Sequence, residues 1–91
     1  MTNKKMLIGS LSNDLFRVAS LKQRGSDKAS LRFLQEAKKW SKELSQYKLK
    51  SYISDIVMKI NAKSETNITL KQAENYLMYG ILLQNYALKT K

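Results

Sequence analysis

The 91-residue sequence predicts an all-α fold, a small four-helix up-and-down bundle that forms one domain. It contains no proline and only three glycines, whereas an all-β domain needs turn residues about every 8 to 12 positions. Four segments instead repeat their apolar residues every three or four positions, which is the period of an α-helix. Apolar residues make up 43% of the chain, enough for a single hydrophobic core.

The first helix is predicted over about residues 3–24. Its apolar stripe consists of Leu7, Ile8, Leu11, Leu15, Val18 and Ala19. Because Gly9 can weaken the first turns, the firm helix could begin as late as Ser10 or Ser12, either of which can serve as N-cap. Gly25 is expected to end the helix, since glycine adopts the left-handed conformation after a helix terminus without steric cost.

The second and third helices are predicted over about residues 27–47 and 49–62, with Ser26 or Asp27 as the first N-cap. The short connection at Gly25 makes the first two helices an antiparallel hairpin. The predicted buried stripes are Leu34, Ala37, Trp40 (or Ser41) and Leu44, and then Leu49, Ile53, Ile56 and Ile60. These stripes differ by roughly 110° around a common axis. One straight helix cannot turn both towards one core, so we expect a break between residues 46 and 50.

Residues 61–67 are polar and are predicted to form a loop, and the last helix is predicted over residues 69–89. Thr69 and Gln72 match the capping-box pattern at its start. We expect its core stripe to be Leu70, Ala73, Leu77, Gly80, Ile81 and Leu88. A second apolar face contains Met78, Tyr79, Leu82 and Tyr86, and no charged residue occurs between Asn75 and Leu88. Either this helix is central in the monomer, or these four residues form an interface with another chain, most simply in a homodimer.

Composition argues against several classes of function. The chain has no cysteine and no histidine, and its seven acidic residues are scattered without the spacing of a catalytic or calcium-binding pair. It has no glycine-rich phosphate loop. We therefore expect no enzymatic activity, no cofactor and no metal site. No segment has the length of a signal peptide core or a membrane span, so we expect a soluble, cytoplasmic protein with no membrane partner.

The net charge of +10 is the unusual quantity, because such an excess attracts polyanions. On the second helix, the positions opposite the apolar stripe form a line of Lys28, Arg32, Gln35, Lys39, Lys42 and Gln46. The candidate nucleic-acid-binding residues are Arg24, Lys28, Arg32, Lys38, Lys39 and Lys42. The chain has fourteen lysines but three arginines. Since arginine is the usual reader of guanine, binding should be directed at the backbone with low sequence specificity.

Two functions remain open at this point. The first is binding of nucleic acid, or of a nucleoprotein complex, through the lysine-rich helix surface. The second is a protein–protein interaction or regulatory module that self-associates through the last helix, with the positive charge serving solubility or an acidic protein partner. The basic line also fits a merely solvated helix face, because the outer side of any amphipathic helix is polar.

Overall fold

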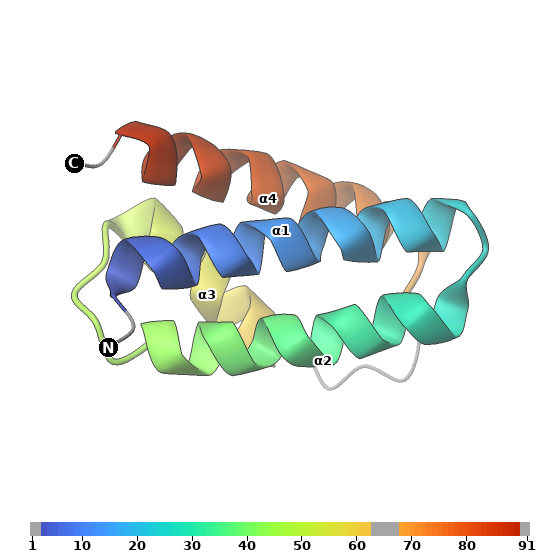
Figure 1. The fold of residues 1–91 in the computed structure, drawn as a ribbon, viewed down its shortest axis with the longest axis horizontal. Coiled ribbons are helices and arrows are strands. Elements are labelled where there is room, and N and C mark those ends of the chain that lie inside the picture. Colours follow the sequence, from blue (N-terminus) through green and yellow to red (C-terminus); the bar gives the residue numbers. More distant parts are fainter. Residues whose placement is uncertain (1–2, 63–67, 90–91) are drawn as a thin grey trace.

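The computed structural model describes residues 3–62 and 68–89, and within them it contains four helices and no strand. The helices are α1 (Lys4–Gln23), α2 (Asp27–Leu44), α3 (Ser51–Ala62) and α4 (Leu70–Lys89). The prediction of an all-α four-helix bundle is confirmed. Figure 1 shows the arrangement: α1 lies between α2 and α4 and runs antiparallel to both, and the shorter α3 crosses obliquely behind them.

The helix at the centre of the monomer is therefore α1. All six apolar residues predicted for its stripe are buried, from Leu7 to Ala19. The helix begins at Lys4 and not at Ser10 or Ser12, because Asn3 acts as the N-cap and its side chain accepts a 2.8 Å hydrogen bond from the Met6 amide. Gly9 is accommodated inside the first turns without interrupting the helix.

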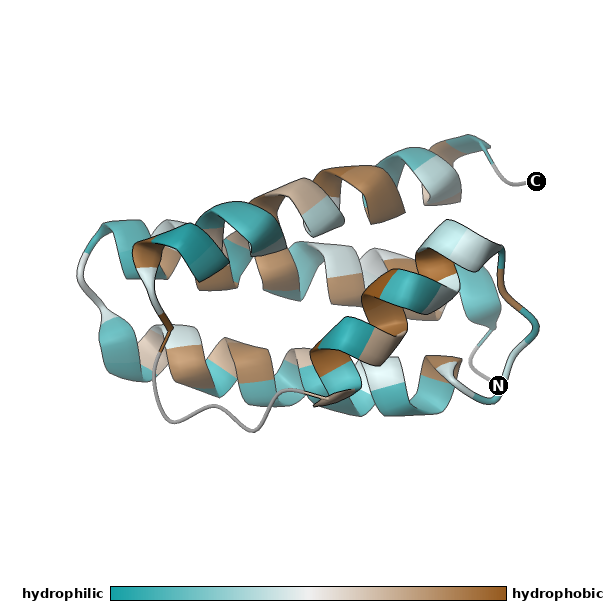
Figure 2. Cartoon of the chain, turned by 180° about the vertical axis from the view of Figure 1, so that it is seen from behind, coloured by the Kyte–Doolittle hydropathy of each residue, from teal (hydrophilic) through white to brown (hydrophobic). Residues whose placement is uncertain are grey.

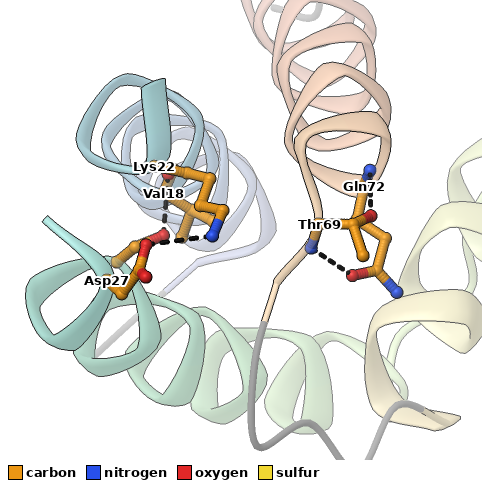
Figure 3. Close-up of polar contacts among 6 residues, drawn as sticks. Val18, Lys22, Asp27, Thr69 and Gln72 are labelled. Carbon is orange, nitrogen blue, oxygen red and sulfur yellow. Dashed lines mark hydrogen bonds and ion pairs between the residues drawn. The ribbon is translucent and has the colours of Figure 1, made fainter. Parts of the chain in front are cut away.

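Gly25 ends α1 as predicted, with φ of 81°. The Gly25 amide donates to the Lys22 carbonyl at 3.0 Å and the Ser26 amide to the Leu21 carbonyl at 2.9 Å, which is the Schellman pattern. Ser26 is the N-cap residue of α2, although its side chain makes no capping hydrogen bond. Asp27 instead forms an ion pair across the turn with Lys22, at 3.0 Å (Figure 3).

The predicted break between the second and third helices is present. α2 ends at Leu44, three residues before the expected position, and α3 begins at Ser51. The change of direction lets both stripes reach one core: Leu34, Ala37 and Leu44 are buried from α2, and Ile53, Ile56, Val57 and Ile60 from α3. Of the alternatives on α2, Ser41 is fully buried and Trp40 only partly.

Both bonds of the predicted capping box are present at the start of α4 (Figure 3). The Gln72 amide donates to Thr69 Oγ1 at 3.1 Å, and the Thr69 amide donates to Gln72 Oε1 at 2.8 Å. Of the predicted loop over residues 61–67, the first two residues belong to the end of α3, and residues 63–67 lie outside the described residues.

The predicted core stripe of α4 is wrong at four of its six positions. Leu70, Leu77, Ile81 and Leu88 are exposed, and only Ala73 and Gly80 of that stripe are buried. The residues that α4 buries are Ala73, Tyr76, Gly80 and Leu83. The helix is therefore rotated about its axis relative to the prediction, with Gly80 facing α1.

Close packing at Gly80 explains this rotation. A Cβ atom at Gly80 would lie 3.0 Å from Cε1 of Phe16 and 3.3 Å from the carbonyl oxygen of Ser12. The Ser12 hydroxyl donates a 2.7 Å hydrogen bond to the Gly80 carbonyl. A leucine or isoleucine in this position would separate the two helices and break the hydrogen bond, so Leu77 and Ile81 are turned away from this contact.

The rotation of α4 can be tested with one matched pair of substitutions. Leu34→Ala removes a side chain that is 2% exposed and should lower the free energy of unfolding by roughly 2–5 kcal/mol. Leu77→Ala makes the same chemical change at a residue that is 37% exposed and should cost less than about 1 kcal/mol. Urea unfolding of dilute protein measures both. Equal losses for the two variants would contradict the observed rotation.

Candidate functional site

The basic residues predicted on the second helix lie on its solvent side. Lys28, Arg32, Lys39 and Lys42 are exposed and lie opposite the buried stripe of α2; we call these four residues the cationic face. Arg24 is also exposed, in the turn that precedes α2. Lys38 differs from these residues, because it is only partly exposed and makes a further contact within the protein. It therefore lies at the edge of the candidate surface and not within it.

The cationic face is not neutralised by neighbouring acids. Among the described residues, no carboxylate lies within 4.0 Å of the charged nitrogens of Arg24 or of the cationic face. Glu36 and Glu43 are exposed on the same helix but lie beside the line of basic residues. The side chains of Lys39 and Lys42, with Trp40, Glu43 and Gln46, border a shallow depression of about 360 Å³. The positive charge is thus available to a ligand from solvent.

The predicted interface on α4 does not form one exposed face. Met78 and Leu82 are 52% and 39% exposed, but Tyr79 and Tyr86 are partly buried and lie against α3. The rings of Tyr86 and Tyr52 meet edge to face with centroids 6.3 Å apart, and Lys59 Nζ lies 5.9 Å from the centre of the Tyr79 ring. The two tyrosines therefore lie towards α3, so only Met78 and Leu82 of the predicted interface belong to the exposed apolar surface of α4.

The sequence analysis missed a buried acid, Asp14, between α1 and α2. Its residue is 4% exposed, and its Oδ2 atom accepts a 2.9 Å hydrogen bond from Nε1 of Trp40. The sequence does carry a signal for this position. Asp14 follows Leu11 by three residues and precedes Val18 by four, which places it on the apolar stripe of the first helix.

The pKa of Asp14 is raised from 3.8 to about 6, chiefly by burial and also by charge repulsion and hydrogen bonding with the neighbouring Glu36. The Trp40 hydrogen bond and the guanidinium of Arg17 act in the opposite direction. The Arg17 guanidinium lies 5.2 Å from the centre of the Phe33 ring. Because Asp14 is covered by packed helices, this group can respond to pH but cannot reach a substrate in the native packing.

A second concave surface lies between α3 and α4. This cleft of about 370 Å³ is lined by Lys59, Ala62, Gln72, Asn75, Tyr76 and Tyr79. None of these residues carries a carboxylate. Over residues 3–62 and 68–89, no three acidic, histidine or cysteine side chains gather as metal ligands would. No helix in the same ranges has the length and apolar character needed to cross a membrane.

Fold and surfaces together define a small, basic, all-α bundle. No protein-family model matches the chain, and comparisons with curated proteins and with solved structures likewise found no match.

Asp14 gives the protein a specific dependence of stability on pH. The pKa of Asp14 is higher in the folded protein than in the unfolded chain, so its protonated form favours folding. That contribution is fully present below about pH 4 and is lost as the pH rises through about 6, a total of about 3 kcal/mol. In Asp14→Asn, the side-chain amide can still accept a hydrogen bond from Trp40 and donate one to Glu36. This variant should not lose stability through this position as the pH rises.

The measurement is urea unfolding from about pH 3 to pH 8, followed by fluorescence of the single tryptophan, Trp40. The stability of Asp14→Asn relative to the wild type should increase with pH across this range. Asp55→Asn alters an acid on the exposed surface of α3 and serves as the control. Parallel pH profiles for the wild type and Asp14→Asn would show that Asp14 has no raised pKa.

Proposed function

We propose that this protein is non-enzymatic and binds nucleic acid through the cationic face of α2, by contacts with the phosphate backbone and with low sequence specificity. One observation carries the proposal. The four basic residues of this face are exposed on one side of one helix, and no carboxylate of the described residues lies within 4.0 Å of their charged groups. A net charge of +10 adds a long-range attraction for polyanions.

The dimensions of the face suit a phosphate backbone. Lys28 and Lys42 are fourteen residues apart on α2, which corresponds to about 21 Å along the helix axis. This length spans several consecutive phosphates of one strand. Three of the four residues are lysines, whose mobile ammonium groups contact phosphates without reading base edges. The geometry therefore supports contacts that position the protein on nucleic acid without selecting a sequence.

The arrangement also differs from an ordinary solvated helix surface. On such a surface, lysine and glutamate usually alternate and pair at spacings of three or four residues. Here Arg32 and Glu36, and likewise Lys39 and Glu43, have the pairing spacing but form no ion pair. Phosphate binding would replace the missing counter-charges and release bound counterions from the nucleic acid.

Salt dependence provides the direct test. If the cationic face contacts about four phosphates of duplex DNA, the logarithm of the association constant should fall against the logarithm of salt concentration with a slope of about −3.6. Replacing both Lys39 and Lys42 by Gln should make this slope less steep by about 2 and weaken binding equally for unrelated sequences. Fluorescence anisotropy with labelled duplex DNA and RNA at several salt concentrations measures both quantities.

A second double variant separates the site from the overall charge. Lys71→Gln with Lys89→Gln also removes two positive charges, but from exposed positions of α4. This control should keep a steeper slope than the variant of the cationic face. Equal effects of the two double variants would mean that only net charge matters. Absence of salt-sensitive binding to either DNA or RNA would refute the proposed function.

A further inference from the structure

The aliphatic residues that α4 turns outward form a regular pattern. Counted along the helix at spacings of 4, 3, 4, 3 and 4, the exposed positions are Leu70, Glu74, Leu77, Ile81, Gln84 and Leu88; we call this set the α4 seam. Such spacing is that of the a and d positions of a coiled coil. The seam extends over almost the whole of α4 (Leu70–Lys89).

The seam has no partner within the described part of the monomer. Its four aliphatic residues are 61%, 37%, 46% and 75% exposed in chain order. On one side of it, the small residues Ala73 and Gly80 pack on α1. The tyrosines that meet α3 lie roughly 160–180° away around the helix axis. Figure 2 shows α3 crossing one side of the bundle, with hydrophobic segments visible along α4.

We propose that the α4 seam pairs with the same seam of a second copy of this chain, with the two helices antiparallel. Antiparallel pairing about position 79 places each residue of the seam opposite another residue of the partner's seam. Leu77 meets the partner's Ile81, Leu70 meets the partner's Leu88, and Glu74 meets the partner's Gln84. Every layer thus joins one a position to one d position.

This self-complementarity identifies the occupant as a second copy. The two-fold axis that relates the copies produces each contact twice, which gives four apolar layers and two polar layers. Two identical chains therefore supply both sides of every layer. The two polar layers pair a carboxylate with an amide group that can donate a hydrogen bond to it. In a parallel pair, by contrast, Glu74 would lie opposite the partner's Glu74, and the like charges would repel.

The distribution of charge is also compatible with self-association. Each copy carries +10, so approach through a basic surface would be opposed by repulsion. The seam contains no basic residue: its one charged residue is Glu74, and no charged residue occurs between Asn75 and Leu88. In addition, α1 lies between α4 and α2 (Figure 1), which separates the seam from the cationic face. The contact therefore joins the least charged surface of each copy.

Two leucine substitutions on α4 form a matched test of the surface used. Leu77 and Leu82 are 37% and 39% exposed, but Leu82 lies roughly 120° or more away from Leu77 around the helix. Leu77→Glu should convert the dimer to a monomer, because it buries a charge in two layers. Leu82→Glu should leave the dimer intact. Light scattering after size exclusion at tens of micromolar protein measures the mass, and circular dichroism checks that both variants remain helical.

A third substitution tests the orientation of the helices. Gln84→Lys places a lysine opposite the partner's Glu74 in the antiparallel arrangement, twice in each dimer, and should lower the dissociation constant several-fold. In a parallel dimer the same change would place lysine opposite lysine and raise the dissociation constant. Analytical ultracentrifugation over a range of protein concentrations measures the dissociation constant of the wild type and of each variant.

Self-association through the α4 seam does not depend on nucleic-acid binding, so either property can be absent without the other. A wild-type monomer at tens of micromolar would overturn the proposed self-association, as would dissociation by Leu82→Glu with an intact Leu77→Glu dimer. If Leu77→Glu fails to fold, Gln84→Lys still decides the question, because it alters an exposed polar position. An unchanged or weakened dimer for Gln84→Lys would then reject the antiparallel seam.

Discussion

The close approach of α4 to α1 at Gly80 determines which residues of α4 face solvent. A Cβ atom there would lie 3.0 Å from the ring of Phe16, so a larger residue would require Phe16 or the helices to shift. The Ser12 hydroxyl then reaches the Gly80 carbonyl. Such a hydrogen bond is directional, whereas apolar contacts alone would tolerate several rotations of a helix that is apolar on most sides. The outward aliphatic seam is a consequence of this inward contact.

The same use of small polar side chains recurs on the other side of α1. Ser30 of α2 is fully buried, and its hydroxyl donates a 2.9 Å hydrogen bond to the Val18 carbonyl. Asp14 and Trp40 form a second polar contact between these helices. Leucines in an otherwise uniform core can slide past one another at little cost, but buried polar groups lose free energy when unpaired. These contacts therefore fix the register of α1 against both neighbours.

The fold was predictable from the sequence because each helical segment repeats its apolar residues every three or four positions. The stripe of α1, the turn at Gly25 and the capping box of Thr69 and Gln72 depend on local chemistry that a single segment displays. The rotation of α4 was not predictable in this way. Aliphatic and aromatic residues surround most of that helix, so periodicity leaves more than one possible buried side, and the choice depends on Phe16, 64 positions away from Gly80.

The two candidate surfaces also differ in how far the sequence alone could place them. Charge is nearly always exposed, so the sequence sufficed to place Lys28, Arg32, Lys39 and Lys42 on the solvent side of α2. The α4 seam required the structure, since the interface predicted from the sequence included Tyr79 and Tyr86, which contact α3. The position of Asp14 within the apolar stripe of the first helix is visible in the sequence, but its partners Trp40 and Glu36 are known only from the structure.

The two surfaces differ in the force that would act on them, and salt affects those forces with opposite signs. Phosphate contacts weaken as salt rises, because releasing the same counterions into a more concentrated solution gains less entropy. An apolar seam is not weakened in this way, and the repulsion between two copies of charge +10 is screened over a Debye length of about 10 Å at 0.1 M salt. Self-association through α4 should therefore strengthen under the conditions that release nucleic acid from α2. A single salt series can thus distinguish a protein that dimerises on its own from one that is gathered only by a shared polyanion.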